Sequence, residues 1–592
     1  MTTTTITAEQ NKRTLKSYFP ILEWLPKYKG SYLRPDLIAA LTVWAVLVPE
    51  AMAYAGIAGM PPETGLYAAP LALIGYAIFG TSRQLDVGPS SAVAALSFSV
   101  VVGLGVVVGS AEFILLTIAL AFMVGIFLAI GGLLKLGVLA DFLSRPVLDG
   151  FVVGVAISIA VGQLDKILGY EPIATLDFVP DILLLIRDIG MIHWPTLVVG
   201  VISLALLFIL HRFTPKLPGA LIVLFLAIGA SALFGFEGRG IHIVGEIPAG
   251  LPDFGIPEGF GLEQLIAVAP GAIGVALVAF VESVSIARAF ATKYGYEVDA
   301  NQELIAVGVS NLGSGFSGSF TVDGSMSRTS TADGAGAKTQ MVSIIAAIAI
   351  LITAVALTGL FFNLPEATLG AIVIHAVWHN INFKKITQYR RFTQLDFITA
   401  LVAMVGVLAL GLLEGLVIAA GLGLVTLLFG TKKRGTHVLG KEPESEVYRS
   451  IEHYPEAITY PGLLIIRFDG TLFFANAHDF VSTLRQYIAS MDPPPKVVLV
   501  DAESINDIDA TAIISLIEFR EQLQETNIQV WLARVKTNVL EIMDSGGIGE
   551  TIPAEHIYPS VHVAVDVYLA EMEKENEMSP PATDEAKPDS SG

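Results

Sequence analysis

The chain has 592 residues, of which 53% are hydrophobic and only 15% are charged, and its mean hydropathy is +0.66. Soluble globular proteins carry about 25% charged residues, so this composition excludes an entirely soluble fold. The absence of cysteine excludes disulfides, thiolate metal sites and cysteine catalysis. The net charge of −20 argues against a nucleic-acid partner.

Charge density changes along the chain and predicts the domain organisation. Charges are sparse between Arg34 and Gly430, and they are dense and of both signs from Thr431 onward. We therefore expect a membrane domain followed by a soluble domain. The predicted divisions are a cytoplasmic N-terminal region (1–35), a transmembrane domain (36–430), a linker (431–459), a small α/β domain (460–572) and a disordered tail (573–592).

Apolar runs of about 20 residues predict roughly fourteen membrane-spanning helices. Clear examples are residues 37–58, 113–134, 197–210, 341–360 and 397–410. Residues 1–10 are polar, so we expect no cleavable signal peptide and an uncleaved first span. Residues 177–190 are typical of an amphipathic helix at the membrane interface. From the distribution of Lys and Arg and an even number of spans, we expect both termini on the cytoplasmic side of a bacterial inner membrane.

Strand-like and helix-like patterns alternate between Tyr460 and Met572, which predicts a small sheet covered by helices. The predicted strands are residues 463–467, 497–501 and 528–533. The predicted helices are residues 478–491, 510–525, 536–545 and 559–571.

The first predicted span contains a proline followed directly by an acid. Pro49 removes a backbone donor and loosens the helix. Glu50 then lies near the middle of the membrane, where an unpaired charge is costly unless it takes up a proton. We expect Glu50 to be a proton-coupling carboxylate beside a substrate cavity; the alternative is a structurally hydrogen-bonded acid in a kinked helix.

Two segments in corresponding halves of the membrane domain are too short or too polar to span it. In the first, Pro89, Ser90 and Ser91 follow a polar run and open a short apolar helix. The second, residues 318–340, is polar and contains Arg328, and such backbone survives between spans only where it lines a cavity or is buried in protein. Paired broken segments indicate the binding site of an inverted-repeat transporter, and their helix N-termini attract anions. The alternatives are an ordinary interfacial span and an exposed loop.

A second membrane acid, Glu282, occupies a place in the second half that resembles that of Glu50. It could bind a coupling cation, take up a proton or form a structural salt bridge with Arg328. His375 and His379 lie four residues apart on one helix face, but without a third ligand we expect no metal there. No cofactor is expected, and an enzyme is disfavoured because no nucleophile–base pair or phosphate loop is evident.

Together these motifs resemble the sulfate permease (SulP) family of anion transporters. The motifs that carry the resemblance are residues 48–55, 65–67, 80–83, 87–91, 325–328 and 337–339, and residues 498–502 and 505–512 of a domain similar to a STAS domain. The resemblance implies an α-helical polytopic membrane protein with about fourteen segments in two inverted seven-segment repeats, forming core and gate domains. It also implies a small cytoplasmic α/β STAS domain and a homodimer.

In this family the anion lies between two half-helices, the third and tenth segments. Carried over to this chain, the residues around the anion are Tyr54, Pro89, Ser90, Ser91, Ser325, Met326, Ser327 and Arg328, with Glu50 and Glu282 as ion-coupling groups. Family members that carry chloride often have an amide at the position of Glu50, whereas a carboxylate repels an anion unless it is protonated.

We therefore expect secondary active transport of sulfate, bicarbonate or a dicarboxylate across the lipid bilayer, coupled to protons through an elevator-like motion. The alternatives are a sodium-coupled symporter with Glu282 as cation ligand, an anion channel or exchanger, and an anion sensor that signals through the C-terminal domain.

Overall fold

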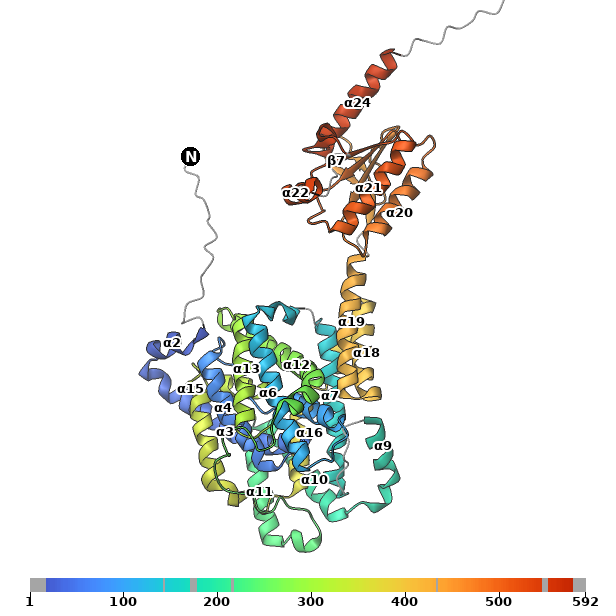
Figure 1. Cartoon of the computed structure of the whole chain (residues 1–592). Coiled ribbons are helices and arrows are strands. Elements are labelled where there is room, and N and C mark those ends of the chain that lie inside the picture. Colours follow the sequence, from blue (N-terminus) through green and yellow to red (C-terminus); the bar gives the residue numbers. More distant parts are fainter. Residues whose placement is uncertain are drawn as a thin grey trace, which may run out of the picture. The chain divides into compact units, whose positions relative to one another are not determined.

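The computed structural model describes residues 18–141, 144–170, 178–214, 218–432, 435–545 and 552–578. The chain divides into two compact units, Met1–Leu424 and Val425–Gly592, which are taken separately below (Figure 1). Residues 1–17 of the predicted N-terminal region and residues 579–592 of the predicted tail lie outside the described residues. Residues 573–578, which we expected in the tail, belong to helix α24 (Val561–Met578), because Glu, Lys and Met are good helix formers.

In its described residues, the first unit contains fourteen membrane segments, seven on each side of the connection 235–261. The first seven are α3 (Gly30–Ile57), α4 (Pro62–Phe79), α5 (Ser91–Val102), α6 (Ala111–Leu133), α7 (Arg145–Gly162) continued by α8 (Leu164–Leu168), α10 (Trp194–Phe213) and α11 (Gly219–Phe234). The second seven are α12 (Leu262–Tyr294), α13 (Ala300–Phe316), α14 (Met326–Gly334), α15 (Met341–Ile352), α16 (Glu366–Trp378), α18 (Gln394–Leu410) and α19 (Leu412–Lys432). The predicted number of segments is therefore confirmed.

Six of these segments are long and apolar enough to cross a membrane by length and composition. They are α3, α6, α7 with α8, α10, α12, and α15 with the π and 3-10 turns that continue it to Phe361. Three short helices accompany the segments: α2 (Ile21–Trp24), α9 (Phe178–Arg187) and α17 (Phe383–Tyr389). The helix α9 falls within the amphipathic stretch predicted over residues 177–190.

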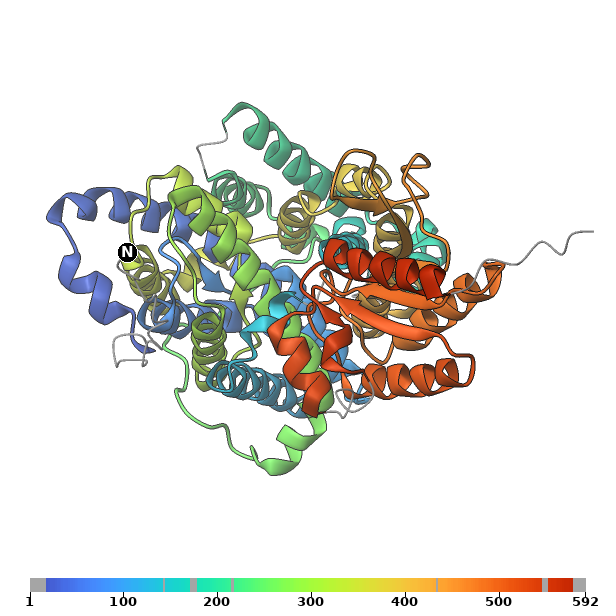
Figure 2. The same cartoon turned by 90° about the horizontal axis from the view of Figure 1, so that it is seen from above.

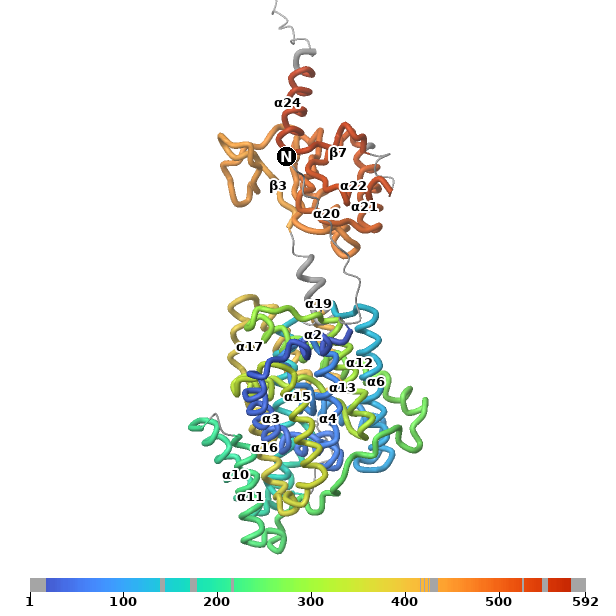
Figure 3. Tube along the Cα trace, turned by 90° about the vertical axis from the view of Figure 1, so that its left-hand side faces the viewer, coloured from blue at the N-terminus to red at the C-terminus, as the bar shows by residue number. Residues whose placement is uncertain are grey.

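Helices from the two halves of the membrane unit pack into two groups. α3, α4, α5 and α6 pack with α12, α13, α14 and α15, whereas α7, α8, α10 and α11 pack with α16 and α18 (Figure 1, Figure 3). These groups are the expected core and gate domains, and α3 also touches α11 and α16 of the gate. Apolar side chains on α10 and α11, such as Val198, Ile209 and Leu226, are about half exposed, as a surface against lipid requires.

The C-terminal unit contains a six-stranded sheet of order β4-β3-β5-β6-β7-β8. The strands are β3 (Thr436–Lys441), β4 (Tyr448–Ser450), β5 (Leu463–Phe468), β6 (Val497–Asp501), β7 (Gln529–Ala533) and β8 (Ile557–Tyr558). Strands β5 to β8 run parallel, and β3 pairs antiparallel with both β4 and β5. Side chains of β5 alternate: Leu464 and Ile466 join the core under α20–α22, whereas Leu463 and Ile465 join the core under α24. The three helices are α20 (Ala477–Ser490), α21 (Ala510–Glu525) and α22 (Thr537–Ser545). Helices cover both faces of this sheet (Figure 2).

The predicted linker 431–459 needs correction, because β3 and β4 lie within it and extend the sheet. Register pairs Val438 with Ile466 of β5 and Leu439 with Ser450 of β4. Acidic and basic residues in this hairpin masked its strands in the sequence. Charged side chains are common on edge strands, where they prevent pairing with another sheet.

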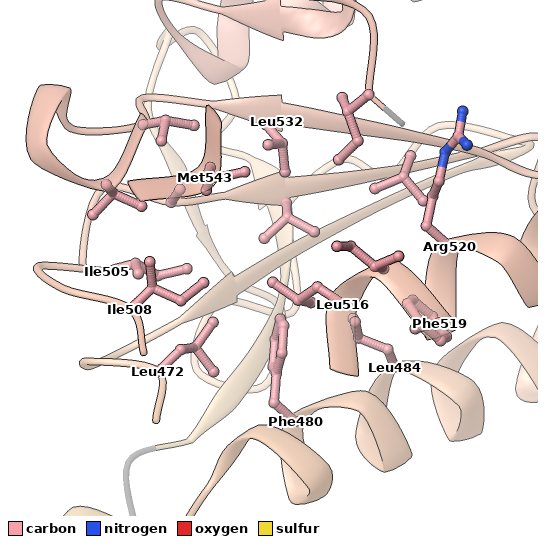
Figure 4. A pocket seen from close by; sticks show the side chains of 17 residues that line it. Leu472, Phe480, Leu484, Ile505, Ile508, Leu516, Phe519, Arg520, Leu532 and Met543 are labelled. Atoms are coloured by element: carbon pink, nitrogen blue, oxygen red, sulfur yellow. The ribbon is translucent and has the colours of Figure 1, made fainter. Parts of the chain in front are cut away.

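The core between the sheet and α20–α22 holds a small apolar cavity of about 50 Å³. Its lining includes Leu472, Phe480, Leu516 and Met543, while Arg520 directs its guanidinium away from the apolar side chains (Figure 4). A water molecule needs polar partners to occupy such a void. The cavity is therefore a packing defect of the core and offers no room for a metabolite.

Gly150→Ala is expected to destabilise the membrane unit. A Cβ at this position of α7 falls inside the contact distance of the Ala400 carbonyl oxygen on α18, so the two helices must separate. Overpacking of this kind costs about 1–3 kcal/mol. Thermal unfolding of the detergent-purified chain measures the loss. The control Gly229→Ala lies on α11 with nothing within 4 Å of its Cβ, and equal melting temperatures for the two variants contradict the prediction.

Candidate functional site

The two broken segments meet inside the core group of helices. Strand β1 (Val87–Gly88) pairs antiparallel with β2 (Asp323–Gly324), in a register of Val87 with Gly324 and Gly88 with Asp323. Helix α5 begins directly after β1, and α14 begins directly after β2. All four strand residues are buried, so both helices begin inside the protein. The prediction of two half-helices is confirmed.

Polar side chains of neighbouring helices satisfy the non-helical backbone of the second segment. Asn311 of α13 donates from Nδ2 to the Val322 carbonyl at 2.8 Å and accepts from the Val322 N–H at 3.0 Å. The Gly324 N–H donates to Ser283 Oγ of α12 at 2.8 Å. Irregular backbone at membrane depth persists only with such partners. In the sequence, Asn311 lies beside Ser310 and Ser283 beside Glu282, and nothing there indicated that their partners are the backbone of residues 322–324.

Arg328 is completely buried and connects three elements of the core group. Its Nε donates to Asp86 Oδ1 at 2.6 Å, and its Nη1 donates to the Pro89 carbonyl at 2.7 Å. Its Nη1 also lies 3.5 Å from Glu50 Oε2 on α3. The salt bridge that we considered between Arg328 and Glu282 is wrong: in the described residues the guanidinium pairs with Asp86 and Glu50.

Several buried polar atoms around Arg328 have no hydrogen-bond partner within the described residues. They are Ser90 Oγ, Glu50 Oε2, Asp86 Oδ2, Glu282 Oε2, both carboxyl oxygens of Asp323, and Arg328 Nη2. Tyr54 is buried on α3, four residues after Glu50 and so on the same face of the helix. Most buried polar groups in proteins have hydrogen-bond partners, so each unpaired group needs an explanation. Here they gather where the N-termini of α5 and α14 meet.

The remaining predicted residues lie around this cluster with different exposure. Ser90 is the N-cap residue of α5, and its side chain makes no capping hydrogen bond. Ser325 caps α14 by accepting from the Arg328 N–H at 3.3 Å. Ser91 is half-buried, whereas Met326 and Ser327 in the first turn of α14 are exposed. The structure thus brings the hydroxyl of Ser90 to the charged groups and leaves Met326 and Ser327 at the accessible side.

Glu303 is a buried acid that sequence reasoning missed. The carboxylate accepts from Tyr76 Oη at 2.7 Å, and from the Thr81 N–H and hydroxyl at 2.7 and 2.6 Å. It ties α13 to the turn between α4 and β1, which carries Asp86 toward Arg328. The run 80–83 marked that turn in the sequence, but its partner lies more than two hundred residues further along the chain.

The structure places a third histidine beside the predicted pair. His379 Nε2 lies 3.1 Å from His211 Nε2, and the rings of His375 and His379 are 5.6 Å apart. Over the part of the chain that is described, no group of three or more His, Asp or Glu is arranged to hold a metal ion.

Comparisons with known proteins agree with this architecture. The profile of the sulfate permease family matches residues 33–403, and that of the STAS domain matches residues 454–564. The chain is 37% identical over 548 residues to a probable sulfate transporter of Mycobacterium tuberculosis, covering 92% of this chain and 96% of the relative. It is 34% identical over 581 residues to the chloroplastic sulfate transporter 4.1 of Arabidopsis thaliana, covering 95% and 84%. A solved structure of SLC26A9 superposes with a TM-score of 0.86 at 25% identity, covering 95% of this chain and 94% of that chain.

The fold and the paired half-helices therefore define a membrane transporter of small anions and not an enzyme. The chain belongs to the sulfate permease family, with a STAS domain at its C-terminus.

Asp86→Ala is expected to destabilise the membrane unit strongly. The substitution leaves a buried guanidinium without its main partner, and breaking a buried ion pair costs about 3–5 kcal/mol. Asp86→Asn keeps an oxygen that accepts from Arg328 Nε and should lose less. The fall in melting temperature relative to the wild type, measured on purified protein, gives the loss of stability in each of the two variants. Removing the carboxylate from an exposed pair, through Asp188→Ala beside Arg187, serves as control and should change little.

Proposed function

We propose that this transporter carries sulfate together with a proton, and that the cluster around Arg328 is the anion site. The names of the relatives from Mycobacterium tuberculosis and Arabidopsis thaliana both specify sulfate. Bicarbonate and a dicarboxylate are the alternative substrates. In this proposal, the protein lies in a bacterial inner membrane with both termini on the cytoplasmic side. It works as a homodimer.

The observation that supports coupling most directly is the excess of buried carboxyl groups over buried cations. Glu50 and Asp86 share the guanidinium of Arg328, and Asp323 has no hydrogen-bond partner in the described residues. An uncompensated buried charge costs several kcal/mol. At least one of these carboxyl groups therefore holds a proton or a cation when water is excluded from the site.

The anion is held by donors that are already in place. Ser90 Oγ and the first N–H groups of α5 and α14 donate to it, and the positive ends of both helix dipoles add attraction. Arg328 contributes positive charge and an unpaired Nη2. Pro89 shapes the entry to α5, and the exposed residues Met326 and Ser327 line the approach.

Glu50 couples the anion to the proton through Arg328. A charged Glu50 lies 3.5 Å from Nη1 and competes with the anion for the same guanidinium. Protonation removes this competition and the repulsion of the anion. Proton and anion then favour each other's binding, which is the thermodynamic condition for symport. An elevator-like motion of the core against the gate moves both across the membrane.

Glu50→Gln is expected to abolish sulfate uptake driven by a pH gradient into proteoliposomes, while sulfate exchange persists. The amide imitates the protonated acid, so anion binding no longer requires a proton. Radiolabelled sulfate uptake with and without an imposed gradient measures the effect. Glu112→Gln, an exposed acid in the first turn of α6, should behave as wild type. Undiminished gradient-driven uptake by Glu50→Gln refutes the coupling role.

Sodium coupling is the second candidate, because Glu282 and Asp323 present unpaired carboxyl oxygens and hard cations prefer oxygen ligands. If the coupling ion is the proton, a sodium gradient at equal pH drives no sulfate uptake, either in the wild type or in Glu282→Gln. Sodium-driven uptake that Glu282→Gln removes favours the alternative. Electrogenic flux without any gradient coupling favours a channel, and anion binding without flux favours a sensor.

A further inference from the structure

A second cavity, of about 830 Å³, opens at the end of the membrane unit where α4 and α12 end and α3 and α13 begin. Its lining comes from four stretches within residues 20–32, 80–84, 294–302 and 337–340. The volume is typical of a small-molecule site. None of the residues proposed for the anion site lines this cavity.

The cavity carries four basic and three acidic side chains, and one of the basic ones, Arg83, lies over the ring of Tyr296 at 5.0 Å from its centroid. Its cations are Lys27, Lys29, Arg83 and Lys338. Within the described residues, none of these four makes an ion pair. The acids are Glu23, Glu297 and Asp299. Asp299 is already engaged as the N-cap of α13, where it accepts from the N–H groups of Asn301 and Gln302. An anionic ligand is therefore favoured.

Gln302 helps to fix the wall of this cavity. Its side chain is almost fully buried, and its Nε2 donates to the carbonyls of Tyr18 and Phe79 at 3.0 and 2.9 Å. These two contacts hold the start of α13 against the end of α4 and the residues before α2. The Oε1 atom is buried as well, so Gln302 shapes the wall and leaves recognition of a ligand to the basic side chains.

An exposed apolar stripe leads away from the cavity along α3. Leu33, Leu37 and Leu41 lie four residues apart and thus on one face, and they are 52%, 43% and 48% exposed. The stripe begins next to Tyr32, which lines the cavity. A ligand that combines an anionic group with apolar chains satisfies both surfaces.

We propose that this cavity binds the phosphate of an anionic phospholipid headgroup, with the acyl chains of the lipid along Leu33, Leu37 and Leu41. The phosphate lies among Lys27, Lys29, Arg83 and Lys338. Basic pockets beside transmembrane helices are suited to such headgroups.

The lipid site is connected to the core of the transporter. Gln340, in the cavity wall, donates from Nε2 to the carbonyls of Ser82 and Leu85 at 2.9 and 2.8 Å. Tyr296 Oη donates to Gln84 Oε1 at 2.6 Å. Both contacts hold the stretch that carries Asp86 to Arg328. A bound headgroup therefore steadies the segment on which the buried ion pair depends.

The test compares lipid binding by the full-length wild type and by the triple variant Lys27→Gln/Lys29→Gln/Arg83→Gln. Phosphatidylglycerol is titrated into phosphatidylcholine nanodiscs that contain the purified chain, and bound lipid is counted by native mass spectrometry. Each basic side chain near the membrane surface contributes about fivefold to affinity, so the triple variant should bind about a hundredfold more weakly. The control variant Lys135→Gln/Lys384→Gln/Arg391→Gln removes three exposed charges outside the cavity and should bind as wild type.

Equal affinity of the cavity variant and the control variant overturns the proposal. Glycerol 3-phosphate serves as a soluble probe of the same headgroup chemistry. If it binds the cavity as tightly as the lipid does, the site belongs to a soluble anion and the lipid assignment is wrong. The measurement is independent of transport, so its outcome does not depend on the proposed proton coupling.

Discussion

The membrane unit depends on one buried ion pair, between Arg328 and Asp86. Each half of the chain contributes one partner, and each partner lies next to a short strand that ends where a half-helix begins. The guanidinium also binds the Pro89 carbonyl, directly before α5. Together with the two-residue pairing of β1 and β2, this crosslink fixes the distance between two polar, non-helical segments that meet among apolar helices. The pair therefore defines where both helix N-termini point.

The polar groups around Arg328 argue against a purely structural role for this cluster. A structural network in a membrane unit would satisfy every member, because unpaired polar groups are expensive there. Glu303 shows what such satisfaction looks like, with three donors to one buried carboxylate. Around Arg328, by contrast, hydroxyl and carboxyl oxygens remain unpaired on several elements. Glu303 is thus a satisfied structural carboxylate, whereas the unpaired groups around Arg328 belong to the proposed anion and coupling site.

Much of this organisation could be predicted from local sequence signals, and the failures have physical causes. Apolar length predicted the spans, and Pro89 and Ser325 marked the half-helix starts, because both signals are local. The pairing of Arg328 with Asp86 joins residues more than two hundred positions apart, so no periodicity reports it. Asp323 was visible only as one polar residue in a polar run. The β3–β4 hairpin was hidden because edge strands tolerate the charges that usually mark a linker.

The register of β1 and β2 also limits how the chain can change over evolutionary time. Only two residues on each side make the pairing, and the helices follow within three residues. A single inserted or deleted residue in either stretch would turn the strand over and rotate the following helix about its axis. The connection 240–261 is irregular, and single backbone hydrogen bonds such as Val244 to Leu364 and Gly255 to Phe316 hold it at separate points, with loop between them that can change in length. Length variation among homologous transporters should accumulate in that connection, while the spacing from Asp86 to Ser91 and from Asp323 to Arg328 stays constant.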